Sequence, residues 1–198
     1  RFEYSVPKVL FGINLFSIDP DLIFESMHRV QEQFENIFKI ELPSPNDWYC
    51  YRVDTCANYI LKSPIQVKNI ITYLQRLDYP RKVKNIYGDT GLYFPSRYNT
   101  LKVYWKGPEF KKHDFDRLKN KKDISVLVDF AQNILRIEVE HRKRLLYMIK
   151  KYELENNVKF NKFEGYIRMA DLMGIFNFKD EMKDYMSKIF CGTKSKVM

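Results

Sequence analysis

The chain is poor in the residues that build disulfide frameworks and zinc sites. It has three cysteines and three histidines in 198 residues, and neither set is regularly spaced. An odd number of scattered cysteines argues against a disulfide scaffold and favours a reducing compartment. Zinc sites usually combine Cys and His at short, regular intervals, which are missing here. We therefore expect neither disulfides nor zinc, and any metal would have to be held by carboxylates.

Long apolar runs and internal repeats are also missing. No segment has the roughly 18 continuous apolar residues of a membrane-spanning helix, and the basic start of the chain is too short for a signal peptide. We therefore expect a soluble, cytoplasmic protein with no membrane partner. The first residue is Arg1 rather than methionine, which indicates an excised domain or a processed chain.

Positive charge and aromatic rings are abundant instead. Lys and Arg outnumber Asp and Glu by 34 to 25, which gives a net charge of +9, and 16% of the residues are aromatic. Such an excess of cations favours a polyanionic partner. Aromatic side chains can stack on unpaired bases. Together these features favour nucleic acid as the partner.

The order of polar and apolar residues predicts an α+β fold. We expect an antiparallel β-sheet with helices on one face and a C-terminal helical segment. The expected strands cover 5–16, 48–61, 83–87, 91–95, 98–110 and 134–141. The expected helices cover 20–37, 64–77, 125–133, 142–155, 164–174 and 179–189, with a solvated loop at 111–123. Residues 1–155 would form the main domain, with 156–198 as a helical extension or as part of the same domain.

Three of the expected strands alternate between apolar and polar residues: Tyr51–Cys56, Thr100–Lys106 and Leu135–Glu140. Residues two apart in a strand share a face of the sheet. The polar faces therefore carry Arg52 and Asp54 in the first strand, Lys102, Tyr104 and Lys106 in the second, and Arg136, Glu138 and Glu140 in the third. If these strands lie side by side, carboxylates, a tyrosine and several cations meet on one surface.

The carboxylates of these faces are candidate metal ligands. Asp54, Glu138 and Glu140 sit in strand centres, where Asp and Glu are depleted. Like charges at close range are unfavourable unless a cation offsets them, and Mg²⁺ or Mn²⁺ takes carboxylate oxygens. Arg52 and Arg136 could instead neutralise the carboxylates as structural ion pairs. Both interpretations remain open from the residues alone.

Tyr104 is the candidate nucleophile of the same surface. Lys102 and Lys106 flank it, and nearby cations are expected to lower the pKa of a phenol. The alternative is an ordinary surface tyrosine, one of 14. Glu109 follows a Gly-Pro bend and could turn back toward the sheet. Tyr147 is a reserve nucleophile, although its apolar neighbours predict a core position.

Three segments of the chain resemble, in the same order, motifs of the filamentous-phage gene II replication initiators, which are nicking-joining endonucleases. The resemblance is more distant to the initiators of rolling-circle plasmids. Tyr51–Asp54 resembles the Arg-hydrophobic-Asp strand of that family, and Asn99–Glu109 resembles its Thr-Leu-x-x-Tyr-x-Lys-x-x-Glu segment. Leu135–Glu138 resembles its Arg-hydrophobic-Glu strand.

The resemblance implies a metal-dependent nick in one DNA strand, which leaves a free 3′-OH and a 5′-phosphotyrosine. It implies Tyr104 as the nucleophile with Lys106 beside it, and Asp54, Glu109 and Glu138 as the ligands of Mg²⁺ or Mn²⁺. Glu140 has no counterpart in the family pattern and is the weaker candidate. The expected partners are single-stranded or supercoiled origin DNA and host helicase or polymerase. The expected DNA-contacting cations are Arg52, Lys102, Arg136, Arg142, Lys143 and Arg144.

Two alternatives stay open at this point. The protein could be a non-enzymatic origin-binding or regulatory protein on the same scaffold, with its carboxylates neutralised by nearby cations. It could also be a metal nuclease in which water, rather than a tyrosine, attacks the phosphate.

Overall fold

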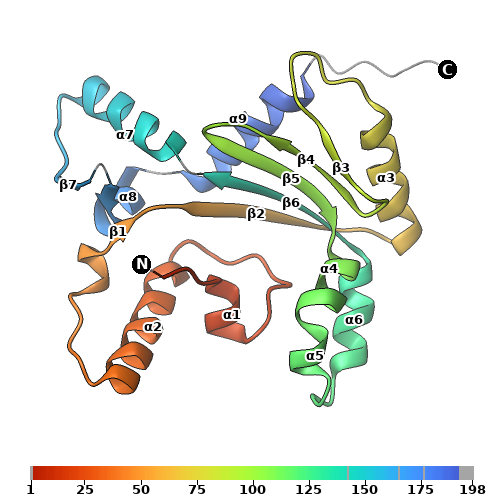
Figure 1. Cartoon of the computed structure of the whole chain (residues 1–198), viewed down its shortest axis with the longest axis horizontal. Coiled ribbons are helices and arrows are strands. Elements are labelled where there is room, and N and C mark those ends of the chain that lie inside the picture. The colour runs from red at the N-terminus through yellow and green to blue at the C-terminus, as the bar shows by residue number, and fades with distance from the viewer. Residues whose placement is uncertain (1, 142, 165, 176, 192–198) are drawn as a thin grey trace. The chain divides into compact units, whose positions relative to one another are not determined.

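The computed structural model describes residues 2–141, 143–164, 166–175 and 177–191. Its chain forms two compact units (Figure 1). Unit 1 combines residues 1–53 with 144–177, and unit 2 combines 54–143 with 178–198. Each unit is therefore built from two separate parts of the sequence. A boundary near residue 155 stays a prediction.

Unit 1 contains a small antiparallel sheet and several helices. Its strands run in the order β1 (Tyr49–Cys50), β8 (Tyr166–Arg168) and β7 (Lys162–Phe163). Its helical elements are α1 (Val6–Phe11), α2 (Leu22–Phe38), η1 (Pro45–Asp47), α7 (Lys143–Asn156) and α8 (Met169–Ile175). The predicted helix at 164–174 was therefore partly wrong, because this stretch includes a strand before its helix begins.

The opening segment is a helix rather than the predicted strand. Pro7 lies in the first turn of α1, where its fixed φ suits the helix and its missing N–H costs nothing. Gly12 ends the helix in the left-handed conformation at φ 74°, and its N–H donates to the Lys8 carbonyl. A short apolar run does not distinguish a strand from a buried helix, which explains the error.

Unit 2 is built on a five-stranded antiparallel sheet. Its strands follow the order β2 (Val53–Ile60), β6 (Ile134–His141), β5 (Asn99–Trp105), β4 (Gly91–Pro95) and β3 (Asn85–Tyr87). Helices α3 (Pro64–Arg76) and α9 (Phe178–Phe190) pack on one face of this sheet. The core between them includes Val67, Ile71, Phe94, Leu101, Val103, Val139, Tyr185 and Ile189. The predicted α+β class, the antiparallel sheet and the C-terminal helices are confirmed.

Three further helices connect β5 to β6 in unit 2. They are α4 (Lys106–His113), α5 (Phe115–Leu118) and α6 (Ile124–Gln132). The predicted strand at 98–110 therefore ends at Trp105, because Pro108 lies in the first turn of a helix, where its missing N–H is tolerated. The predicted loop at 111–123 is wrong in part, since it contains the end of α4 and all of α5.

Gly91 permits a close approach of β4 to the strand that carries Tyr104. It lies directly opposite Tyr104, and a Cβ atom at Gly91 would come within 2.9 Å of both the Tyr104 Cβ and the Val103 carbonyl oxygen. Neither of these two atoms can move unless the backbone of β5 moves with it. We expect Gly91→Ala to lower the free energy of unfolding by about 1–3 kcal/mol. In thermal unfolding, that loss corresponds to a Tm lower by about 2–12 °C.

The matched control for this prediction is Gly174→Ala in α8. A Cβ atom at Gly174 would meet nothing within 4 Å. Replacing an exposed helical glycine by alanine should raise stability slightly. A Tm of Gly91→Ala equal to that of the parent chain would show that β4 and β5 are not this close.

Candidate active site

The three alternating segments of the sequence lie side by side in the five-stranded sheet. Strand β6 separates β2 from β5, and β5 pairs with β6 so that Lys102 lies opposite Glu138 and Tyr104 opposite Arg136. The face that carries these side chains is the one opposite α3 and α9. We call it the polar face. The polar surface that alternation predicted is therefore formed within unit 2.

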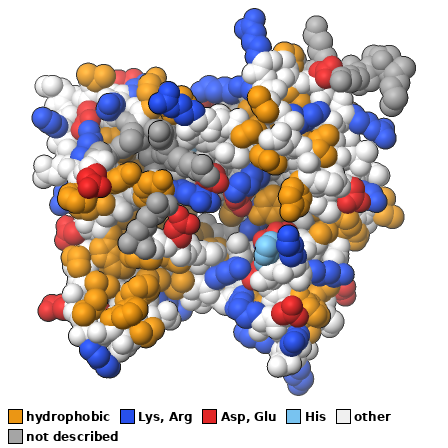
Figure 2. All heavy atoms as spheres, viewed as in Figure 1, with side chains coloured by type: hydrophobic (Ala, Val, Ile, Leu, Met, Phe, Trp, Pro, Cys, Tyr) orange, Lys and Arg blue, Asp and Glu red, His pale blue; other side chains and the backbone are white. Residues whose placement is uncertain are grey.

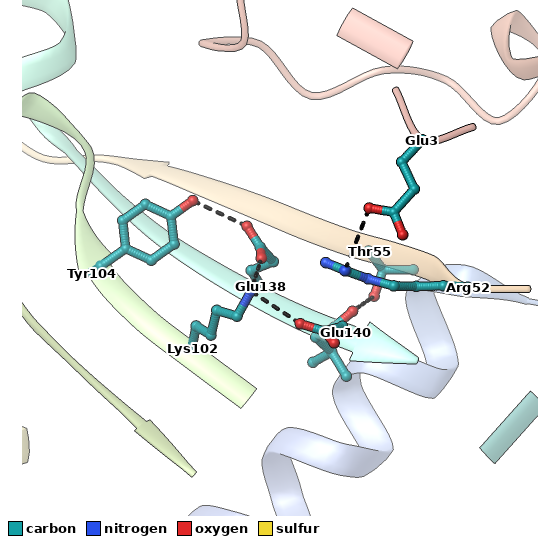
Figure 3. Close-up of polar contacts among 8 residues, drawn as sticks. Glu3, Arg52, Thr55, Lys102, Tyr104, Glu138 and Glu140 are labelled. Atoms are coloured by element: carbon teal, nitrogen blue, oxygen red, sulfur yellow. Dashed lines mark hydrogen bonds and ion pairs between the residues drawn. The ribbon is translucent and has the colours of Figure 1, made fainter. Parts of the chain in front are cut away.

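Glu138 lies at the centre of the polar face (Figure 3). One of its carboxylate oxygens accepts a hydrogen bond from the Lys102 Nζ at 2.8 Å, and the other accepts one from the Tyr104 hydroxyl at 3.0 Å. Lys102 also lies 3.2 Å from a carboxylate oxygen of Glu140. A single ammonium group thus bridges two carboxylates, and one of these carboxylates accepts the hydrogen bond of the tyrosine.

The expected lowering of the Tyr104 pKa is wrong. Burial and the negative charge of Glu138 raise the pKa of Tyr104, while Arg136 lowers it by a smaller amount. Lys102 is drawn to Glu138 and Glu140 and does not act chiefly on the phenol. Tyr104 therefore holds its proton at neutral pH. A reaction through its oxygen needs an acceptor for that proton, and the carboxylate of Glu138 is in hydrogen-bonding contact with it.

Helix α4 returns Glu109 to the polar face, which strand alternation alone does not predict. Lys106 and Glu109 are three positions apart in this helix and form an ion pair. Glu109 also contributes to the raised pKa of Tyr104, so its carboxylate lies near the phenol. Lys106 is fully buried, and burial lowers the pKa of its ammonium group, with a further lowering from Arg136.

Cys56 and Asn58 also belong to the polar face, although the sequence analysis gave neither of them a role in the site. The Arg136 Nε donates to the Asn58 Oδ1 at 2.7 Å. Burial raises the pKa of Cys56, and Arg136, Glu138 and Asp54 add smaller effects, so this thiol lies among them. Both residues follow Asp54 at steps of two, and extending the alternation from Cys56 by one more step would have found Asn58.

The other candidate residues are less central. Asp54 is exposed near the start of β2. Arg52 lies between β1 and β2 and belongs to unit 1, where it lies 3.9 Å from Glu3 (Figure 3). The expected strand at 48–61 was therefore wrong in treating Arg52 and Asp54 as neighbours on one strand.

Some of the predicted site residues lie in unit 1, and others lie outside the residues that the structure describes. Tyr147 lies on α7 in unit 1, and its exposed fraction of 60% contradicts the predicted core position. Arg142 lies outside the described residues, as do the side chains of Lys143 and Arg144. Their role as DNA-contacting cations stays a prediction.

The carboxylates Glu109, Glu138 and Glu140 of the polar face are engaged by lysine side chains. Within the described ranges, no group of three Asp, Glu, His or Cys side chains is placed to hold an ion. Glu138 and Glu140 share the ammonium group of Lys102, and Glu109 is paired with Lys106. A divalent ion between Glu138 and Glu140 would require Lys102 to move. In this arrangement the carboxylates are paired with lysine ammonium groups, so we assign no reaction step to a metal.

Comparison with known proteins places the chain in a family. A family model for the N-terminal part of the replication-associated gene II protein of phages matches residues 2–163. Neither the curated proteins nor the solved structures gave a match. In the part of the chain that the structure describes, no helix has the length and apolar character needed to cross a membrane. The family match covers most of the chain and the whole polar face, and the chain therefore belongs to the gene II-type phage replication initiators.

Proposed function

We propose that this protein nicks one strand of origin DNA through a 5′-phosphotyrosine intermediate and so starts rolling-circle replication. The observation that carries the proposal is the hydrogen bond of 3.0 Å from the Tyr104 hydroxyl to Glu138. A tyrosine in contact with a proton acceptor and surrounded by cations suits attack on a phosphodiester. Membership of a replication-initiator family supports DNA as the substrate.

In the proposed step, the Tyr104 hydroxyl loses one proton and the 3′ oxygen of the cleaved strand gains one. The Tyr104 oxygen attacks the phosphorus, and its proton passes to the Glu138 carboxylate. The bond from phosphorus to the 3′ oxygen breaks, and that oxygen takes a proton from water. Lys106 is fully buried and paired with Glu109, so it acts through its positive charge, which stabilises the charge that develops on the reacting oxygens. The reverse transfers rejoin the strand, as a strand transferase requires.

Lys102 keeps the proton acceptor ionised. It contacts both Glu138 and Glu140, and without its charge the two carboxylates would repel each other and take up a proton. Arg136 is almost fully buried beside Tyr104 and adds positive charge near the phosphate. We assign Lys102 and Arg136 to positioning and charge stabilisation.

The direct test uses supercoiled DNA that carries the origin of the encoding replicon. The proposal predicts conversion to open circles with a single cut position, and no conversion of the same DNA without the origin. Conversion of both DNAs at scattered positions would indicate a non-specific nuclease and overturn the proposal.

We also propose that this activity operates in the cytoplasm and that host helicase and polymerase then act at the free 3′ end.

A requirement for Mg²⁺ or Mn²⁺ is a separate proposal, with Asp54, Glu109, Glu138 and, less strongly, Glu140 as ligands. It predicts that a chelator abolishes nicking and that either ion restores it, because a hard divalent cation binds carboxylate oxygens. Nicking assays in chelator, with and without added ion, provide the measurement. Undiminished nicking in chelator would disprove the metal requirement and leave the transfer from Tyr104 to Glu138 intact.

The second candidate function is an origin-binding protein without enzymatic activity. It is favoured by the pairing of Glu138 and Glu140 with Lys102, and of Glu109 with Lys106, since paired carboxylates need no metal. Origin binding without any nick or covalent adduct would support it. Efficient cutting without an adduct would instead indicate that water is the nucleophile.

A further inference from the structure

The helices between β5 and β6 form a projecting lobe, which we call the helical lobe (residues 106–133). Its interior contains Phe110 and Leu118, both essentially inaccessible to solvent. The lobe is fastened to the sheet because the Trp105 Nε1 donates to the Gln132 carbonyl at 2.8 Å. Helix α4 begins two residues after Tyr104, so the lobe extends from the strand of the candidate nucleophile (Figure 1).

The excess positive charge of the chain lies entirely in the unit that carries this lobe. Unit 2 has 23 Lys and Arg and 13 Asp and Glu, a net charge of +10. Unit 1 has 11 Lys and Arg and 12 Asp and Glu, a net charge of −1. The polyanion expected from the composition therefore has an electrostatic reason to bind unit 2.

The surface of the helical lobe carries lysines for which no ion pair with a carboxylate is found among the described residues, and residues 106–133 have seven Lys and Arg and five Asp and Glu, a net charge of +2. The lobe acids Glu109 and Asp114 are already paired, with Lys106 and Arg117 respectively. Exposed Asp116, Asp123 and Asp129 offset part of the remaining positive charge. The exposed lysines of the lobe are Lys111, Lys112, Lys119, Lys121 and Lys122. Figure 2 shows Lys and Arg side chains along this part of the molecule.

We propose that the helical lobe binds the sugar–phosphate backbone of DNA next to the phosphate that Tyr104 attacks. This inference rests on the proposed function. Helix α4 has eight residues and is therefore about 12 Å long. Nucleotides of one B-form strand are about 3.4 Å apart, so the lysines beyond α4 would reach DNA roughly four nucleotides or more from the cut. Lysine is a point charge and would hold the backbone without reading bases.

The test compares a lobe variant with a control of equal charge. The variant is Lys119→Gln, Lys121→Gln and Lys122→Gln, at the turn between α5 and α6. The control changes Lys68, Lys183 and Lys188 to Gln, on the helices that cover the opposite face of the sheet. Binding is measured by fluorescence anisotropy with two origin DNAs. The short DNA extends about three nucleotides from the cut on each side and the long DNA about twelve, so that only the long DNA can reach the lysines of the lobe.

On the long DNA, we expect the lobe variant to raise Kd about tenfold and to reduce the salt slope of log K by about 2. On the short DNA, the lobe variant should bind as the parent chain does, and the control should bind both DNAs nearly normally. DNA extended on one side only should show which flank the lobe contacts.

Three results would overturn the proposal. Equal loss in the control would indicate a general effect of net charge, equal loss on the short DNA would indicate an effect at the cut site, and no loss at all would exclude the lobe from DNA binding. Because anisotropy reports binding whether or not a nick forms, the lobe result stands even if the protein does not cut DNA. Absence of nicking with intact, lobe-dependent binding would contradict only the proposed function.

Discussion

Replacing Tyr104 by Phe should abolish the covalent DNA adduct while leaving DNA affinity almost unchanged. The substitution removes only the attacking oxygen and keeps the ring. Loss of a nucleophile should lower adduct formation by at least about a thousandfold. Loss of the hydrogen bond to Glu138 should cost only about 1 kcal/mol of stability. The adduct is measured on denaturing gels with labelled DNA, and affinity is measured by anisotropy.

Two other tyrosines provide the controls for this result. Tyr73 lies on α3, on the other side of the sheet, and is 58% exposed. Tyr73→Phe should form the adduct normally. Tyr147→Phe tests the reserve nucleophile, whose exposure leaves it accessible. If the adduct still forms in Tyr104→Phe but not in Tyr147→Phe, the nucleophile is Tyr147 of unit 1 and not Tyr104.

Replacing Glu138 by Gln should lower the rate of adduct formation by about 10²–10⁴-fold. The amide has the same shape but cannot take the proton of Tyr104. Removing the charge of Glu138 eliminates one of the causes that raise the pKa of Tyr104, but burial remains the largest cause. The phenol should therefore stay protonated at neutral pH. The residual rate should rise as pH increases, because deprotonation then has to come from solvent, and single-turnover rates measured from mildly acidic to mildly basic pH would show it.

Glu140→Gln is the matched control for this prediction. Glu140 shares Lys102 with Glu138, whereas the hydroxyl of Tyr104 donates to Glu138. We expect Glu140→Gln to retain most of the rate and the pH profile of the parent chain. An equal loss in the two variants would show that the number of carboxylates matters, rather than proton transfer to Glu138.

Local patterns in the sequence predicted the scaffold of the site well. The strand at 134–141 has the predicted bounds, and the helix predicted from residue 64 begins at Pro64. The strands predicted at 83–87 and 91–95 correspond to β3 and β4, which pair antiparallel. Strict alternation identified the polar faces, because a strand with one face in a core must bury every second residue. The family resemblance added that these faces belong to one site.

The errors arose where chain direction or charge depended on distant residues. Alternation continued past Trp105 would have placed Glu109 away from Tyr104, but helix α4 returns it. The pKa of Tyr104 was expected to fall because its sequence neighbours are lysines. It rises because burial and a carboxylate from another strand dominate, and neither is visible in local sequence.

The most direct measurement of the central claim is mass spectrometry of the trapped adduct. The parent chain would be incubated with labelled single-stranded origin DNA and Mn²⁺, then digested, and the peptide that carries the nucleotide would be sequenced. Our account predicts a 5′-phosphate linkage on Tyr104. A linkage on Tyr147, or efficient cleavage with no linked peptide, would contradict it.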